Sequence, residues 1–215
     1  MPQPTTDDAP GHQTAVVGAV LVGGRSSRFG TDKALADAGG RPLGLRVADA
    51  LRQGGADPVV AVGGRAGSRL GLVTVPDRTA DQGPLAGLAS ILLWARTGLV
   101  VVAPCDLPLL SGRHVAALVA AAGTDPRRAG VATTGGAGRQ RPQPSLACWP
   151  AAAGPLIQRL VDDGHRAWRD ALTVVEWAPV PLPPEAMADA DTPASLQAIL
   201  HDDRPDHDGP GPAGA

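Results

Sequence analysis

The chain has 215 residues, 43% of them hydrophobic and 19% charged, which is enough for one sizeable core or at most two small domains. A formal net charge of -2 gives no electrostatic case for binding nucleic acid or an anionic membrane. No apolar run reaches the roughly 18 residues of a membrane span, and the polar, acidic start of the sequence shows no export signal. We therefore expect a cytoplasmic protein.

The two ends of the sequence differ in composition from its middle. Residues 1–13 and 201–215 are too polar to bury the apolar surface that offsets the entropy of ordering, so we expect two disordered tails. Residues 14–200 are expected to form a single domain. Cys105 and Cys148 lie in hydrophobic segments without metal-type spacing, which favours buried free thiols over a disulfide.

Short apolar runs alternate along the chain with segments of helical periodicity. The runs predicted as strands are 15–22, 59–62, 72–75, 99–103, 130–134, 145–149 and 173–177. Helical faces are predicted within 43–51, 85–92, 115–122, 156–161 and 196–200. This alternation indicates an open, mostly parallel α/β sheet. In such sheets ligands bind beyond the carboxyl ends of the strands, so functional residues are expected in the loops that follow strands.

The loop after the first predicted strand is rich in glycine and cations. Residues 23–33 include three glycines, two serines, two arginines and Lys33, the single lysine among 19 basic residues. Glycines let consecutive backbone N–H groups point into one concavity, where a phosphate can approach. Arg28 and Lys33 would then neutralise a polyphosphate. The Walker pattern fails because two residues separate Gly30 from Lys33, and a plain turn is the alternative on composition alone.

Residues 21–33 resemble the L-A-G-G-x-S-x-R-M/F-G-x-D-K signature of nucleotidyltransferases related to the molybdenum cofactor guanylyltransferase, with valine at the usual alanine position. The resemblance implies a Rossmann-like three-layer sandwich of the nucleotide-diphospho-sugar transferase type, in which this loop wraps a nucleoside triphosphate. The nucleotide-binding positions that it implies here are Leu21, Val22, Gly23, Gly24 and Lys33. Arg28 and Lys33 are implied as catalytic residues that contact the phosphates.

Two acidic segments are candidates for holding a metal ion. Asp106 directly follows the strongest predicted strand, where a carboxylate can bind Mg²⁺ from a rigid support; a turn or helix-capping role is the alternative. Its segment resembles the family's P-x-D-x-P/D-x-P, which implies a catalytic, nucleotide-binding and metal-binding role. Asp191 lies in a segment that resembles N/D-x-N/D-T-P and is either a further metal ligand or a helix start. Guanylyltransferases often carry Asn in this segment, so Asp191 slightly favours a cytidylyltransferase.

Two further segments resemble nucleotide-binding parts of the family. Gly83, Pro84 and Leu85 match the G-P-L-A-G motif, in which backbone beside the nucleotide begins a helix. Asp77 corresponds to a nucleotide-contacting Asp, whose carboxylate can accept both the N1–H and the 2-amino group of guanine. The family often has Asn after the second strand, where this chain has Gly63-Gly64-Arg65, so the base preference stays open.

The acceptor side of the site is expected at a short basic segment. Arg139 and Arg141 resemble the family's Q-P/H-P-T region and would bind a phosphorylated acceptor such as molybdopterin; a solvated loop is the alternative. The five histidines do not cluster in the sequence. His114 and His165 are predicted as surface helix residues.

The resemblance implies transfer of GMP from GTP to the terminal phosphate of molybdenum-molybdopterin, with Mg²⁺ as cofactor and pyrophosphate as the second product. The attacking phosphate oxygen is already ionised near neutral pH, so no general base is required. The alternatives are a molybdenum cofactor cytidylyltransferase, another small-molecule nucleotidyltransferase and a nucleotide-binding regulatory protein without turnover. Transient contact with proteins that deliver the cofactor or mature molybdoenzymes is also implied, and neither nucleic acid nor membrane is an expected partner.

Overall fold

A computed structural model describes residues 14–22, 32–76, 82–135 and 140–202. The sites predicted at Gly23, Gly24, Arg28, Asp77 and Arg139 lie outside these ranges. None of the helices in the described ranges is long and apolar enough to cross a membrane.

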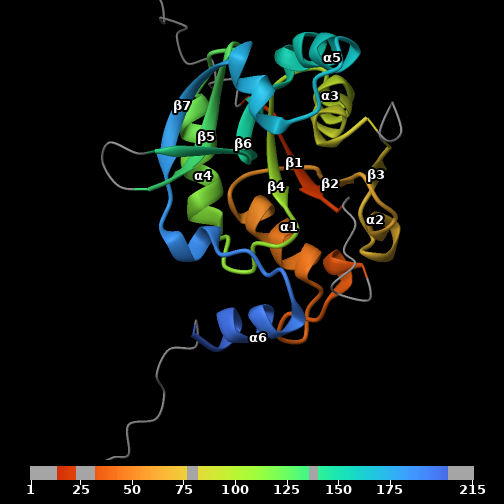
Figure 1. The fold of residues 1–215 in the computed structure, drawn as a ribbon, viewed down its shortest axis with the longest axis vertical. Helices are drawn as coiled ribbons and strands as arrows, with labels where there is room; N and C mark the ends of the chain where they lie inside the picture. Colours follow the sequence, from red (N-terminus) through yellow and green to blue (C-terminus); the bar gives the residue numbers. More distant parts are fainter. Residues whose placement is uncertain (1–13, 23–31, 77–81, 136–139, 203–215) are drawn as a thin grey trace, which may run out of the picture.

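One sheet of seven strands runs through the described part of the chain, in the order β3-β2-β1-β4-β6-β5-β7 (Figure 1). The strands are β1 Val16–Leu21, β2 Val59–Val62, β3 Thr74–Val75, β4 Leu99–Pro104, β5 Arg128–Thr134, β6 Arg141–Pro150 and β7 Glu176–Pro181. Strand β6 is antiparallel to both of its neighbours, and the other adjacent pairs are parallel. The mostly parallel sheet predicted from the sequence is confirmed.

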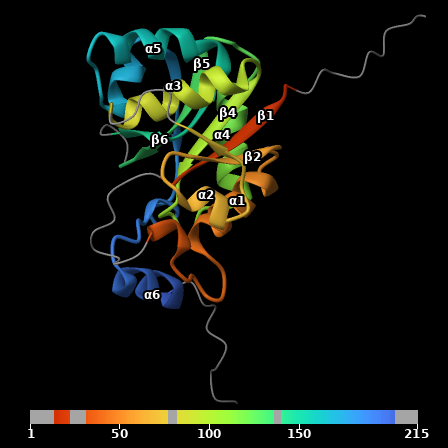
Figure 2. The ribbon, with the colours of Figure 1, turned by 90° about the vertical axis from the view of Figure 1, so that its right-hand side faces the viewer.

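Helices cover both faces of this sheet and complete a three-layer sandwich (Figures 1 and 2). They are α1 Leu43–Gln53, α2 Ala66–Arg69, α3 Pro84–Ala95, α4 Gly112–Ala122, α5 Gly154–Asp162 and α6 Pro193–Asp202. The described residues also form the 3-10 helices η1 Lys33–Leu35, η2 Ala151–Ala153, η3 Trp168–Thr173 and η4 Pro184–Met187. One core cluster lies between the sheet and α1, α2 and α4, and a second lies between the sheet and α3 and α5. The predicted sandwich is therefore confirmed.

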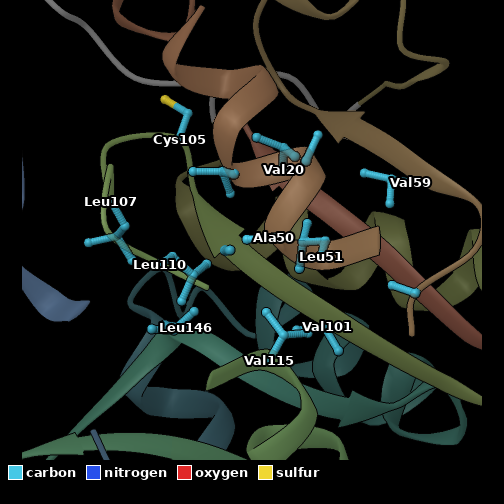
Figure 3. Packing of buried hydrophobic residues seen from close by; sticks show 14 of the residues in the cluster. Val20, Ala50, Leu51, Val59, Val101, Cys105, Leu107, Leu110, Val115 and Leu146 are labelled. Carbon is cyan, nitrogen blue, oxygen red and sulfur yellow. The ribbon is translucent and has the colours of Figure 1, made fainter. Parts of the chain in front are cut away.

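The central strands are apolar on both faces because each face meets a helical layer. On β4, Val101 and Ala103 belong to the α1–α4 core, whereas Val100 and Val102 belong to the α3–α5 core. The loop after β4 continues the first of these cores: Figure 3 shows Cys105 and the leucines that follow it beside β4. Buried side chains thus fix the position of the loop in which functional residues are predicted.

Two predicted strands differ from the observed ones. The sequence predicts a strand at 173–177, but η3 runs to Thr173 and β7 begins at Glu176. Strand β7 contains Pro179 and Pro181, which are tolerated because β7 is an edge strand and only one side of it must form ladder hydrogen bonds. The strand predicted at 145–149 begins earlier, at Arg141, so the part of the basic segment from Arg141 onward belongs to β6 and is not the solvated loop given as the alternative.

Gly130 tests how closely β5 packs against α4. A Cβ atom at this position would overlap the Leu118 carbonyl oxygen of α4. Gly130→Ala should therefore lower the free energy of unfolding by about 2 kcal/mol, because helix backbone must move to admit the methyl group. Gly154→Ala is the matched control: its Cβ meets Leu93 atoms at 3.2 Å and should cost clearly less. Urea unfolding measures both, and equal losses would contradict this packing.

Candidate active site

Lys33 enters the site from the first turn after the glycine-rich loop. It begins η1, and the side chain of the preceding Asp32 accepts a hydrogen bond from the Ala34 N–H at 3.3 Å, which caps the turn. Ala34 is fully buried in the α1–α4 core. The backbone at Lys33 is thereby anchored, and its long side chain extends from a fixed point.

The pairing of β1 with β4 places Asp106 at the carboxyl edge of the sheet, where it contacts Lys33. The two strands are parallel neighbours and end together, with Leu21 opposite Pro104. The register continues past their ends, because the Cys105 N–H donates to the Leu21 carbonyl at 3.2 Å. As predicted from the sequence, the aspartate after the strongest strand lies at the carboxyl edge of the sheet, beside the end of β1.

Asp191 reaches the same place from near the C-terminal end of the domain. The Ala190 N–H donates to the Asp106 carbonyl at 2.9 Å, which ties this segment to the loop after β4. A small third core of Ala38, Leu43, Ala190 and Leu196 then fixes α6 against the residues before α1, and Figure 2 shows α6 beside that segment. This cluster was not predicted from the sequence, and it is what positions Asp191.

The side chains of these three segments meet at Lys33. Its ammonium nitrogen lies 3.0 Å from Asp106 Oδ2 and 3.0 Å from Asp191 Oδ1. The Lys33 side chain is 15% exposed, whereas those of Asp106 and Asp191 are 25% and 58% exposed. Burial by itself lowers the pKa of Lys33, but the hydrogen bonds to the two aspartates outweigh it and leave the pKa above its usual value of 10.5. Lys33 is therefore a charged ammonium at neutral pH.

The two carboxylates are chemically suited to a magnesium ion. Mg²⁺ in phosphate-transferring sites binds through one or two carboxylates and takes its other ligands from water and substrate phosphates. The described ranges contain no group of three or more His, Cys, Asp or Glu side chains that could hold a metal ion without other ligands. Asp106 and Asp191 already share one cation, the Lys33 ammonium. The donor set fits an ion that is shared with a triphosphate.

A cavity of about 310 Å³ opens beside Asp106. It forms where β6 departs from regular pairing: the adjacent β5 residues Val131 and Ala132 pair with Ala147 and Gln143, which are not adjacent. Such bulges re-aim side chains next to binding sites. The polar lining of the cavity comes from Asp106, Thr134, Gln143, Ser145 and Asp189. Sequence reasoning missed most of this lining, although Asp189 lies in the same motif as Asp191.

Arg141, predicted to bind the acceptor, lies near this cavity. It is exposed at the start of β6 and pairs in register with Thr134, which lines the cavity. Of the residues predicted to bind nucleotide, Leu21 ends β1 and Val22 follows it. Val22 is buried, and its N–H donates to the Val62 carbonyl at 3.0 Å. Arg141 is therefore accessible to a ligand, and at the end of β1 only Leu21 is partly exposed.

Gly83, Pro84 and Leu85 begin α3, as the sequence predicts. Gly83 has a positive φ of 81° and would bring a Cβ atom within 3.2 Å of Arg166 Cβ, so a side chain is disfavoured twice. Leu85 is fully buried, and its N–H donates to the Arg166 carbonyl at 3.2 Å. Gly83 and Pro84 are exposed, so these two residues of the motif are accessible to a ligand, whereas Leu85 is not.

The structure also places the two cysteines and two of the histidines. Cys105 and Cys148 are buried free thiols, as expected, and burial raises the pKa of each to about 12. They are therefore poor nucleophiles. The prediction for His114 was wrong: it lies on α4 but is 6% exposed, and its ring accepts from the Ser111 N–H to cap the helix. His165 is exposed but lies after α5 rather than on it.

The strand order and layers are those of the nucleotide-diphospho-sugar transferase fold. Residues 18–176 match the model of the MobA-like NTP transferase domain, and the chain belongs to this family.

The chain resembles named members of this family over different lengths. It is 48% identical over 105 residues to a molybdenum cofactor guanylyltransferase of Xanthomonas euvesicatoria, covering 48% of this chain but only 53% of that protein. It is 40% identical over 167 residues to the molybdenum cofactor guanylyltransferase of Burkholderia vietnamiensis, and this match covers 72% of this chain and 80% of that protein. The structure of molybdopterin-guanine dinucleotide biosynthesis protein A from Archaeoglobus fulgidus has a TM-score of 0.68 at 22% identity, covering 86% and 96%. At that identity the structural likeness supports the fold.

Leu196 tests whether the third core positions Asp191. Leu196→Ala removes a side chain that is 2% exposed at the centre of this cluster and should loosen the docking of α6 by about 2 kcal/mol. We expect faster hydrogen exchange in 188–202 and little change in β1 and β4. The exposed Gln197, changed to Ala on the same helix, is the control. Unchanged exchange in 188–202 after Leu196→Ala would contradict this role.

Proposed function

We propose that this chain transfers GMP from GTP to the terminal phosphate of molybdenum-molybdopterin and releases pyrophosphate. The observation that carries the proposal is the meeting of Lys33, Asp106 and Asp191, three predicted site residues from distant segments, around one charged contact. The molybdenum cofactor guanylyltransferases among its relatives, at 34% to 48% identity, support this choice of substrates.

The chemistry follows from the residues at this edge of the sheet. A phosphate oxygen of the acceptor attacks the α-phosphorus of GTP, the bond between the α-phosphorus and the bridging oxygen breaks, and pyrophosphate leaves with that electron pair. Because the nucleophile is already an anion, the protein must neutralise charge and align the two substrates rather than remove a proton. The Lys33 ammonium supplies positive charge for the phosphates.

Asp106 and Asp191 are the residues that would hold a magnesium ion, whose chemistry is to offset the negative charge of the triphosphate oxygens. The cavity lined by Thr134, Gln143 and Ser145 also has Asp106 in its lining and is the proposed place for the acceptor. Arg141 is proposed to contact the acceptor's phosphate. Both substrates would then lie beside Asp106, close enough for the acceptor oxygen to reach the α-phosphorus.

A turnover assay tests the proposed reaction and its base preference. With molybdenum-molybdopterin and Mg²⁺, GTP should yield pyrophosphate and the guanine dinucleotide, whereas CTP should yield little of either. Thermal unfolding with Mg²⁺ and each nucleotide measures binding separately, because a ligand that binds only the folded state raises the melting temperature. Turnover with CTP alone would make the protein a cytidylyltransferase. Stabilisation by GTP without any turnover would favour a nucleotide-binding regulatory protein.

Asp106→Asn separates catalysis from folding. The amide keeps the shape of the side chain but removes the charge that faces Lys33 and the proposed metal ion. We expect at least about a hundredfold loss of turnover, with a change in the free energy of unfolding of about 1 kcal/mol or less, because Asp106 is partly solvated and Lys33 keeps Asp191 as a partner. Asp49→Asn, on an exposed ion pair of α1, is the control and should retain turnover. Wild-type rates for Asp106→Asn would refute the role of Asp106.

A further inference from the structure

Lys33 occupies the point at which two carboxylates from distant parts of the chain converge. Asp106 and Asp191 lie 73 and 158 residues further along the chain, and each has an oxygen 3.0 Å from the same nitrogen. Two carboxylates that share one point repel each other unless a cation lies there. In the described structure the ammonium of Lys33 is that cation.

The choice of lysine at this point is informative. The other described ion pairs with a permanently charged cation use arginine, at Arg41, Arg52 and Arg127, and 18 of the 19 basic residues in the chain are arginine. Arginine holds carboxylates with a rigid, forked group, whereas lysine carries a compact charge on a flexible stem. A fixed structural ion pair would be served by either residue. A cation that must leave its carboxylates is better served by lysine.

The surroundings of Lys33 allow such a movement. Its backbone is held by the capped turn of η1 and by buried Ala34, so only the side chain need move. Asp191 is 58% exposed, which leaves its side of the contact open to solvent. The backbone at Asp106 is fixed more firmly. The N–H of the preceding Cys105 donates to the Leu21 carbonyl, and the Asp106 carbonyl accepts from the Ala190 N–H.

We propose that Lys33 is the resident counter-ion of Asp106 and Asp191 in the nucleotide-free protein, and that it excludes a divalent cation from them until a triphosphate is present to receive its ammonium. The inference rests on the proposed function, since it takes the two aspartates as the metal-binding pair. It adds a second role for Lys33: besides contacting phosphate, it prevents the cation from binding alone.

The coupling follows from the charges. A divalent cation that arrives alone must displace the Lys33 ammonium, whose side chain is mostly buried. The ammonium would then lose its carboxylate partners, which opposes binding of the cation. When a triphosphate is present, its oxygens accept the displaced ammonium and that cost disappears. Cation and nucleotide therefore assist each other's binding through Lys33, and by linkage the assistance is equal in both directions.

Lys33→Met provides the test, because methionine keeps much of the length and removes the charge. Mn²⁺ is the probe, since its binding to the nucleotide-free protein can be followed directly by electron paramagnetic resonance. Without the competing ammonium, the two carboxylates attract the ion more strongly, and we expect the Kd for Mn²⁺ to fall by at least about tenfold. An unchanged or weaker affinity would overturn the proposal.

Two matched variants separate the local effect from that of net charge. Arg52→Met removes one positive charge from an exposed arginine–aspartate pair on α1 and should leave Mn²⁺ affinity at the wild-type value. Lys33→Arg keeps a positive charge beside the aspartates and should stay within a few-fold of wild type. If Arg52→Met tightened Mn²⁺ binding as much as Lys33→Met does, net charge would explain the result and the proposal would fail.

A second measurement needs no variant, because the chain has a single lysine. With ¹⁵N-lysine labelling, the side-chain nitrogen of Lys33 gives one resonance. We expect it to keep its position when Mg²⁺ is added alone and to shift when Mg²⁺ and GTP are added together. A shift of equal size with Mg²⁺ alone would contradict the exclusion.

The manganese measurement uses no substrate, so it is independent of turnover. If Lys33→Met binds Mn²⁺ more tightly but the wild-type protein does not turn over GTP, only the proposed function is refuted. Normal GTP turnover with unchanged Mn²⁺ affinity would refute the counter-ion role alone.

Discussion

The contact of Lys33 with Asp106 and Asp191 is the point on which the functional edge of this molecule depends. It joins the turn after the glycine-rich loop, the loop after the central strand β4 and the segment before the last helix. None of these segments alone forms a site. Each carboxylate is stabilised there because a cation lies between them, and the cation is held because both carboxylates converge on it.

Different parts of the fold supply the two halves of this contact. The pairing of β1 with β4 places Asp106, and the sandwich cores on both faces stabilise that pairing. Lys33 is held by η1, through Ala34 in the α1–α4 core. Asp191 depends instead on the small third core around Leu43 and Leu196 and on the hydrogen bond from Ala190 to Asp106. The site can therefore loosen on the Asp191 side while the sheet stays intact, because the third core is much smaller than the other two.

The sequence predicts the position of Asp106 at the edge of the sheet, but it predicts only the motif of Asp191 and not its contact with Lys33. A buried apolar run followed by Pro-Cys-Asp predicts an aspartate at the carboxyl edge of a sheet, and Asp106 lies there. The motif at Asp191 was recognised, but its contact with Lys33 depends on packing between α6 and the residues before α1, which no local pattern encodes. The cavity beside Asp106 depends on the β6 bulge, since alternation predicts strands but not an irregular register. Strand β7 was misplaced because its prolines disfavour a strand assignment except at an edge.

The same few residues belong both to the contact with Lys33 and to the cavity, which is the arrangement that the proposed reaction between two substrates needs. Asp106 contacts Lys33 and also lines the cavity formed at β6. Asp189 lines that cavity, and Asp191, two residues later, contacts Lys33; between them, buried Ala190 is bonded to Asp106. A ligand in the cavity and one at Lys33 would thus both lie beside Asp106. Reacting phosphates brought together there need a balancing positive charge, and the chain places its single lysine at this point.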